Sequence, residues 1–381
     1  MFSPTIIKRF IILLVMVGSA TLMAGFFSNT NNIALRLAED IIPIKKIKQK
    51  RPLTALIPNL PRKDFPIITP PEAVKAFYIT ASSALTPSSI NRIINVIENS
   101  EVNAAVVNVK ESDGVFLTPK IVKLVQRLRD KNIYPIARIV IFQDNQLARE
   151  RPELALKDEE GELWGKGGYH FVDPANKEIW DYTIAIANKA LDIGFAEINF
   201  DYVRFPDGYV DDIVYPFYKY DRLKKDVINE AAEYINGKIK EKHPEAIISL
   251  DIFAYAFLRT HDVGIGQKLT DLVDHYDVIA PMIYPSHYGP GNFGFENPAE
   301  HPYQVVLQTL QHGINQLKEA NKETIIRPWI QDFNMGAIYD KEKIQQQIKA
   351  IEDAGLKSGW MVWNPSNFYI QNEFDFSEEN Q

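Results

Sequence analysis

The chain of 381 residues contains no cysteine. Without a thiol it cannot form a disulfide, a thiolate zinc site, an iron–sulfur cluster or a lipobox attachment. Histidine is scarce as well: all seven lie at or beyond His170, and none stands in a His-x-His pair or a His-Glu-x-x-His motif. The sequence therefore carries no metallohydrolase pattern, and we expect no metal and no cofactor.

Excess positive charge is also lacking, since the formal net charge is -7. A nucleic-acid partner usually requires a basic face, so we expect none. Residues 289–294 match the dinucleotide pattern G-x-G-x-x-G, but Pro290 lies inside the match and no helix is expected to open there, so a loop is the better interpretation. No nucleophile elbow indicates Ser-His-Asp catalysis.

The first 27 residues have the pattern of an export signal. Lys8 and Arg9 precede an apolar run over 10–27, as the charged and apolar regions of a signal peptide do. The run of roughly 18 residues is also just long enough to span a bilayer. We therefore expect an exported protein, with residues 1–27 as either a cleaved signal or a membrane anchor that keeps the remainder outside. This segment is the one part of the chain for which we expect contact with a membrane.

Residues 28–71 predict a connector. Seven prolines recur between Pro43 and Pro71 without hydrophobic periodicity, and residues 44–51 are basic. Such composition is typical of an extended tether and not of a packed domain.

Strand and helix patterns then alternate over residues 72–370, which we assign to one domain, with residues 371–381 as a C-terminal tail. Eight such units in about 300 residues predict parallel strands with right-handed crossovers, and favour a (β/α)8 TIM barrel over an open sheet. The expected strands are 75–79, 103–109, 133–142, 195–200, 246–253, 277–284, 324–330 and 359–363. The expected helices are 87–99, 119–131, 176–193, 218–242, 268–275, 302–321 and 341–354.

The barrel prediction places function at the C-terminal ends of the strands. Polar and aromatic side chains follow most of these ends, and they are our candidates for substrate binding: Lys110, Asp113, Arg204, Tyr255, Tyr284, Trp329, Gln331, Asp332, Trp363 and Asn364. Asp113 also fits a Ser-Asp-Gly turn, and Trp329 and Trp363 also fit the barrel core. For Trp360 we prefer a core position.

The fourth strand carries Glu197, Asn199 and Asp201 at alternate positions, so the three share one face. Arg138 lies inside the third strand, where an unpaired charge would be costly. Glu197 on the adjacent strand is its expected structural partner. Asp201 is expected at the mouth of the barrel.

Three segments, residues 102–114, 134–140 and 197–206, resemble a bacterial glycoside hydrolase family first catalogued as a domain of unknown function. The likeness covers about residues 75–365, and the block Glu-Ile-Asn-Phe-Asp-Tyr-Val-Arg-Phe-Pro over 197–206 is its most specific part. The resemblance implies a TIM barrel remotely related to amylase-like hydrolases, with Asp201 as the counterpart of their strand-four catalytic aspartate. Those enzymes have a glutamate at the end of strand five, whereas this chain has Asp251.

Glycoside hydrolysis usually needs two carboxylates. We expect Asp201 to be the nucleophile or electrostatic stabiliser, kept ionised by Arg204 or Lys110. Asp251 is the expected proton donor, with a pKa raised by burial and by neighbouring charge, and Asp332 and Asp113 are in reserve. The predicted substrate is an extracellular or cell-wall polysaccharide. The alternative is a barrel that binds such a glycan at the cell envelope without cleaving it.

Overall fold

The computed structural model describes residues 52–208 and 212–374. The chain divides into two compact units, Met1–Pro52 and Leu53–Gln381, of which we describe the second. The predicted export segment, residues 28–51 of the predicted connector and residues 375–381 of the predicted tail lie outside the described residues. None of the helices in the described ranges combines the length and the apolar composition that a bilayer span requires.

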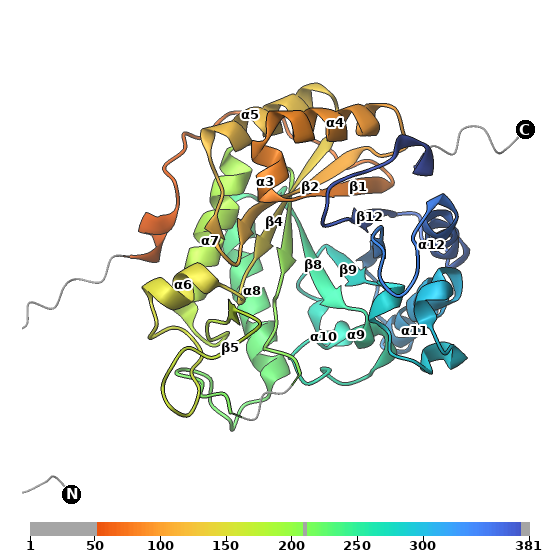
Figure 1. The fold of residues 1–381 in the computed structure, drawn as a ribbon. Helices are drawn as coiled ribbons and strands as arrows, with labels where there is room; N and C mark the ends of the chain where they lie inside the picture. The colour runs from red at the N-terminus through yellow and green to blue at the C-terminus, as the bar shows by residue number, and fades with distance from the viewer. Residues whose placement is uncertain (1–51, 209–211, 375–381) are drawn as a thin grey trace, which may run out of the picture. The chain divides into compact units, whose positions relative to one another are not determined.

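Eight parallel strands close into a barrel, which confirms the predicted (β/α)8 architecture (Figure 1). Around the ring each strand pairs with the next, and the last, β12, pairs with the first, β1. The seventh strand is split, because Pro328 separates β10 from β11 and a proline cannot donate to the ladder. In ring order the strands are β1 (Val74–Ile79), β2 (Ala104–Glu111), β4 (Tyr134–Val140), β7 (Glu197–Asp201), β8 (Ile247–Phe253), β9 (Val278–Met282), β10 (Ile325–Ile326) with β11 (Trp329–Gln331), and β12 (Gly359–Trp363).

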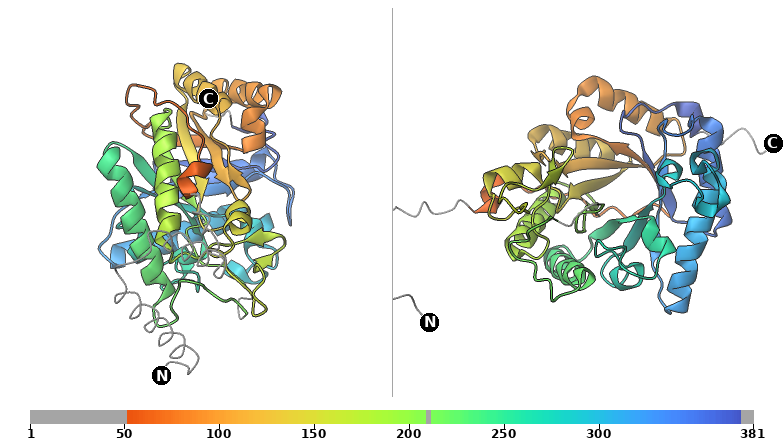
Figure 2. Two further views of the ribbon diagram at one scale, coloured as in Figure 1. Left: turned by 90° about the vertical axis from the view of Figure 1, so that its left-hand side faces the viewer. Right: turned by 60° about the horizontal axis from the view of Figure 1, so that its bottom comes forward.

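Helices cover the outside of the barrel, and Figure 2 shows two of the longest, α7 and α8, side by side. Several begin where the sequence has an N-terminal signal: Pro119 opens α5, and the Thr118 side chain accepts a hydrogen bond from the Ile121 amide. The helices are α3 (Ala81–Leu85), α4 (Pro87–Glu98), α5 (Pro119–Asp130), α6 (Asn145–Glu150), α7 (Lys177–Asp192), α8 (Lys224–Lys242), α9 (Tyr255–Leu258), α10 (Leu269–Leu272), α11 (Pro302–Glu319) and α12 (Lys341–Asp353).

Short elements that we did not predict lie in the loops after the strands. They include α3, α6 and α9, together with the hairpin of β5 (Gly165–Lys166) and β6 (Tyr169–His170). Strand β3 (Gly114–Val115) returns antiparallel against β2, so that Asp113 occupies the turn that we considered for it. Within the described residues, five 3-10 helices complete the fold: Leu53–Leu56, Pro285–His287, Asn292–Gly294, Pro298–Glu300 and Gln371–Glu373.

The strands separate two apolar cores. Residues that point outward, such as Phe77 and Val107, pack with the helices in the larger core. Residues that point inward, such as Ala76 and Val106, fill the barrel itself. The alternation follows the two-residue period of a strand, so the barrel interior is a packed core below the mouth.

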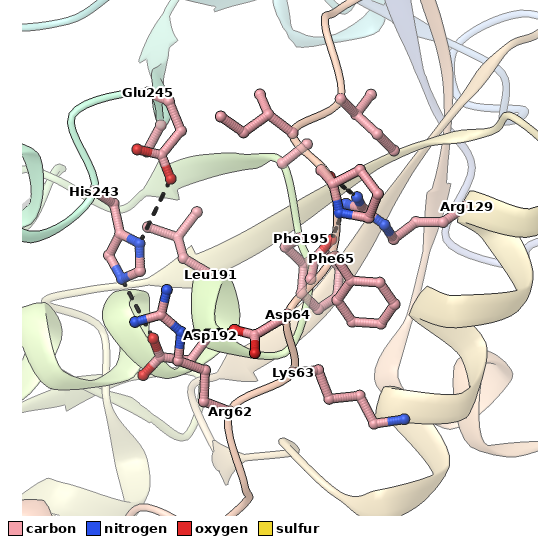
Figure 3. A pocket seen from close by; sticks show the side chains of 16 residues that line it. Arg62, Lys63, Asp64, Phe65, Arg129, Leu191, Asp192, Phe195, His243 and Glu245 are labelled. Carbon is pink, nitrogen blue, oxygen red and sulfur yellow. Dashed lines mark hydrogen bonds and ion pairs between the residues drawn. The ribbon is translucent and has the colours of Figure 1, made fainter.

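Part of the predicted connector, residues 53–71, lies against the barrel. Leu53 and Leu60 belong to the larger core, and the Arg129 guanidinium lies 4.6 Å from the centre of the Phe65 ring. Figure 3 shows the small cavity of about 150 Å³ that this segment forms with the residues just before β7 and β8. That cavity is therefore at the N-terminal ends of the strands, opposite the expected site.

Closure of the ring depends on Gly359, the first residue of β12. Its φ is +89°, and a Cβ atom there would lie 2.1 Å from the Val74 carbonyl oxygen of the paired strand. We expect Gly359→Ala to lower the free energy of unfolding by about 2–4 kcal/mol, because both strain and a backbone clash oppose it. Urea unfolding measures the change.

The matched control is Gly237→Ala in α8, where a Cβ atom meets nothing within 4 Å. This change should raise the free energy of unfolding by up to about 1 kcal/mol, since alanine is the better helix former. Equal stability of the two variants would contradict the closure argument.

Candidate active site

Inward-facing side chains of the second to fifth barrel strands meet at the mouth. The strand pairing sets Asn108 beside Arg138 and Arg138 beside Asn199. Phe200 pairs with Leu250, so the residues that follow them, Asp201 and Asp251, come at the same level of β7 and β8. Register thus gathers an arginine and two amides at one level, and two aspartates at the next level toward the mouth.

Arg138 lies at the centre of this group and is almost completely buried. It forms an ion pair with Asp201, donates a 2.8 Å hydrogen bond to Asn108 Oδ1, and places Nε 3.6 Å from Asp251 Oδ2. Burial lowers the pKa of Arg138, but the carboxylate of Asp201 and the other negative neighbours more than offset this and leave the pKa above its ordinary value. The guanidinium is therefore a permanent charge between the two aspartates.

Two predicted ion pairs were wrong: the partner expected for Arg138 and the cation expected beside Asp201. Glu197, four residues before Asp201 on the same strand, does not pair with Arg138; its Oε1 accepts a 2.8 Å hydrogen bond from Arg327. Asp201 is held by Arg138 and not by Lys110 or Arg204. Arg138 and Asp201 lie on adjacent strands, with Asp201 two residues beyond Asn199, the residue that pairs with Arg138. Arg327 comes from a non-adjacent strand, because the tilt of the strands in a closed barrel brings side chains together across the interior.

Asp201 terminates β7 with both carboxylate oxygens engaged. Oδ2 faces Arg138, and Oδ1 accepts a 2.6 Å hydrogen bond from the Tyr202 amide. Tyr202 has φ of 55°, an uncommon left-handed conformation for a tyrosine. Such outliers concentrate at functional sites, and this one turns the chain directly after the carboxylate.

Asp251 has a different environment. Its Oδ1 accepts hydrogen bonds from Asn199 Nδ2 at 2.8 Å and from Trp329 Nε1 at 2.6 Å. Burial, followed by the negative charge of Asp201, raises the pKa of Asp251 to about 8, although Arg138 and the two hydrogen bonds act in the opposite direction. Two neighbouring carboxyl groups in unlike environments suit the separate roles of acid and anion.

A cavity of about 490 Å³ opens above these residues. Its walls come mainly from the loops after β7, β8 and β9, and they include four of the predicted binding residues. The lining residues are Arg138, Asp201, Tyr202, Arg204, Asp207, Asp251, Phe253, Ala254, Tyr255, Met282, Tyr284, His287, Tyr288 and Trp363.

Other predicted residues lie below or beside this cavity. Lys110 is buried, with its Nζ 2.8 Å from Asp144 Oδ2 and hydrogen bonded to the Val140 carbonyl oxygen. Trp329 is buried in the barrel and holds Asp251, and Trp360 lies in the core as expected. These contacts give Lys110 and Trp329 positions behind the cavity surface.

Three further candidates lie at the ends of β11 and β12: Gln331 ends β11, Asp332 follows it and Asn364 follows β12. Gln331 is buried and accepts a hydrogen bond from the Ser286 amide at 3.1 Å. Asp332 Oδ2 accepts one from Asn364 at 2.9 Å, and burial raises the pKa of Asp332 to about 7. Neither Asp332 nor Asn364 is among the residues that line the cavity, so their contacts tie two loops together.

Some residues of the site were not among our candidates. Tyr78 and Asn108 belong to it, because Asn108 donates a 2.7 Å hydrogen bond to Tyr78 and the Arg138 guanidinium lies 5.7 Å from the centre of the Tyr78 ring. The sequence did contain a feature that could have identified Tyr78 and Asn108, because each is a polar residue at an inward-facing position of an apolar strand. Tyr202 and Tyr288 carry no such signal in the sequence, since loops place them.

The chain matches the model of a protein family described as "Putative glycosyl hydrolase domain" over residues 76–369. No curated protein matches the chain. Among solved structures, an α-galactosidase from Thermus thermophilus, in complex with stachyose, is 13% identical with a TM-score of 0.52; the match covers 82% of this chain and 65% of that enzyme.

Two further structures are similar. The spore cortex-lytic enzyme SleL of Bacillus cereus is 11% identical with a TM-score of 0.51, over 79% of this chain and 73% of SleL. An α-amylase from Lactobacillus plantarum is 11% identical with a TM-score of 0.50, over 80% of this chain and 74% of the amylase. These likenesses confirm the barrel fold. The family match spans nearly the whole barrel, and the chain therefore belongs to this glycosyl hydrolase family.

Proposed function

We propose that the protein is an exported glycoside hydrolase that cleaves an extracellular or cell-wall polysaccharide with Asp201 and Asp251. The observation that carries the proposal is the pair of aspartates on adjacent strands, bridged by Arg138 and open to one cavity. The basic residues and apolar run of the first 27 residues support export.

Asp251 is the proton donor in this scheme. A carboxyl group with a pKa of about 8 is protonated at neutral pH and can give its proton to the glycosidic oxygen as the bond to the anomeric carbon breaks. Water supplies the hydroxyl group that the anomeric carbon receives and, in the completed cycle, the proton that restores Asp251.

Asp201 acts on the sugar ring, where positive charge develops as the glycosidic bond breaks. Its carboxylate, in an ion pair with Arg138, serves as the nucleophile or as the electrostatic stabiliser of that positive charge. Arg138 also contacts the second carboxyl group, with its Nε 3.6 Å from Asp251 Oδ2. The chemistry needs no group beyond the side chains and water.

Aromatic rings provide the sugar-binding surface. Tyr255, Tyr284, Tyr288 and Trp363 line the cavity around the aspartates, and large rigid rings contribute much contact area for the apolar faces of a sugar. Arg204 lies on the wall beside them, with its guanidinium 4.5 Å from the centre of the Phe253 ring and an ion pair to Asp207.

The test is hydrolysis by the full chain of a panel of starch, galactomannan, chitin, chitosan and peptidoglycan. We expect new reducing ends from at least one of these polymers. Binding to a polymer by the wild-type protein without release of reducing ends would instead support the alternative, a barrel that binds glycans without cleaving them.

A further inference from the structure

A second cavity of about 590 Å³ lies in the other half of the barrel mouth. Its walls come from the loops after β1, β2, β4 and β12, whereas those of the first cavity come mainly from the loops after β7, β8 and β9. The lining residues are Tyr78, Thr80, Ser82, Ser83, Asn108, Glu111, Ser112, Asp113, Arg138, Val140, Gln143, Tyr169, Tyr202 and Pro365.

The two cavities meet at the reacting groups. Arg138 and Tyr202 line both of them. Asp201 is the ion-pair partner of Arg138 and is followed directly by Tyr202. Asp201 lines the first cavity, while its ion-pair partner and its chain neighbour form the wall that the two hollows share.

The second cavity has the chemistry of a site for a hydroxyl-rich ligand. Hydroxyl, amide and carboxylate groups make up most of its wall, and Tyr169 is 51% exposed. Glu111 Oε1 accepts hydrogen bonds from the Ala81 amide at 3.2 Å and from Asn108 at 2.6 Å. These bonds fix Glu111 and, through Asn108, tie it to Arg138.

We propose that the second cavity binds the sugar units on the far side of the bond that is cut, so that the enzyme cleaves inside a glycan chain. This inference rests on the proposed function. A blind pocket accepts only a chain end, whereas hollows on both sides of the catalytic carboxylate let a chain run through. Each volume lies within the roughly 300–1,000 Å³ that is usual for ligand sites.

Tyr169→Ala tests the second cavity without touching the aspartates. The matched control is Tyr220→Ala, another exposed tyrosine that lines neither cavity and is 72% exposed. We expect Tyr169→Ala to weaken binding of long oligosaccharides by about tenfold and to leave short ones unchanged, since one aromatic contact is lost. Tyr220→Ala should change neither.

Binding is measured by calorimetry with malto- and chito-oligosaccharides of graded length, on the full chain carrying Asp201→Asn so that nothing is cleaved. The second cavity is supported as a glycan site if affinity rises with oligosaccharide length in the protein that keeps Tyr169, and if this rise is lost when Tyr169→Ala is added. Affinity that does not depend on length, or that depends on length equally in both tyrosine variants, overturns it.

Product analysis with the wild-type protein separates this inference from the proposed function. Internal cleavage lowers the viscosity of a polymer before much reducing sugar appears, and this is the expected result. Release of terminal sugars alone would overturn internal cleavage while leaving the glycosidase assignment intact. If no polymer of the panel is cut, the proposed function fails, and the calorimetry still decides whether the second cavity binds glycans.

Discussion

Replacing Asp201 with asparagine is expected to lower kcat on the substrate polysaccharide by about 10⁴-fold, the order of loss seen when a group that acts directly on the reacting carbon is removed. Asparagine keeps the shape and an oxygen for the Tyr202 amide. It cannot supply a negative charge to the anomeric carbon. Rates of reducing-end release at saturating substrate measure the effect.

The change also removes the partner of Arg138, a buried cation. Loss of one member of a buried pair costs about 3–5 kcal/mol of folding stability, so thermal unfolding must accompany the kinetics. The assay temperature is then chosen below the transition of the variant. A folded Asp201→Asn protein that retains more than about one tenth of wild-type kcat would exclude Asp201 from the proposed role.

Asp332→Asn is the matched control for this experiment. It is the same change at another buried aspartate, whose pKa burial also raises, to about 7, but which does not line the cavity. Its loss of kcat should be less than about tenfold. A loss as large as that of Asp201→Asn would mean that neutralising any buried aspartate of the mouth disables the enzyme.

Replacing Asp251 with asparagine is expected to lower kcat by about 10²–10⁴-fold, the usual contribution of a general acid. The loss should be small with an aryl glycoside whose leaving group departs without protonation. Asp201→Asn should lose activity on both substrates, because its role does not depend on the leaving group. Parallel kinetics with polysaccharide and aryl glycoside distinguish the two roles.

The pH profile gives a second measure of Asp251. A general acid works in its protonated form, and the pKa of Asp251 is raised to about 8. The wild-type kcat/KM should therefore hold through neutral pH and fall as pH rises through about 8. This alkaline limb should be absent from the residual activity of Asp251→Asn. A limb that persists unchanged in the variant would assign the acid to another group.

For the buried charges, the sequence predicted that partners are needed but not which residues they are. The strand pattern correctly indicated that Arg138 and Glu197 each need a partner, since unpaired charges are costly inside a barrel. The adjacent strand was the simplest source for both partners. Arg138 does pair with the adjacent strand, but with Asp201 and not with Glu197. Glu197 instead pairs with Arg327, from a strand three positions around the ring.

The sequence by itself determined the order of strands and helices and the position of Asp201 at a strand end, because two-residue and helical periodicities are local properties of the chain. Only the tertiary structure decided that Trp329 and Asn199 hold Asp251, that Arg138 contacts both aspartates, and that a second cavity adjoins the first. These features depend on barrel closure and on loop conformation. Both bring together residues that are far apart in the chain, and no short-range pattern encodes such contacts.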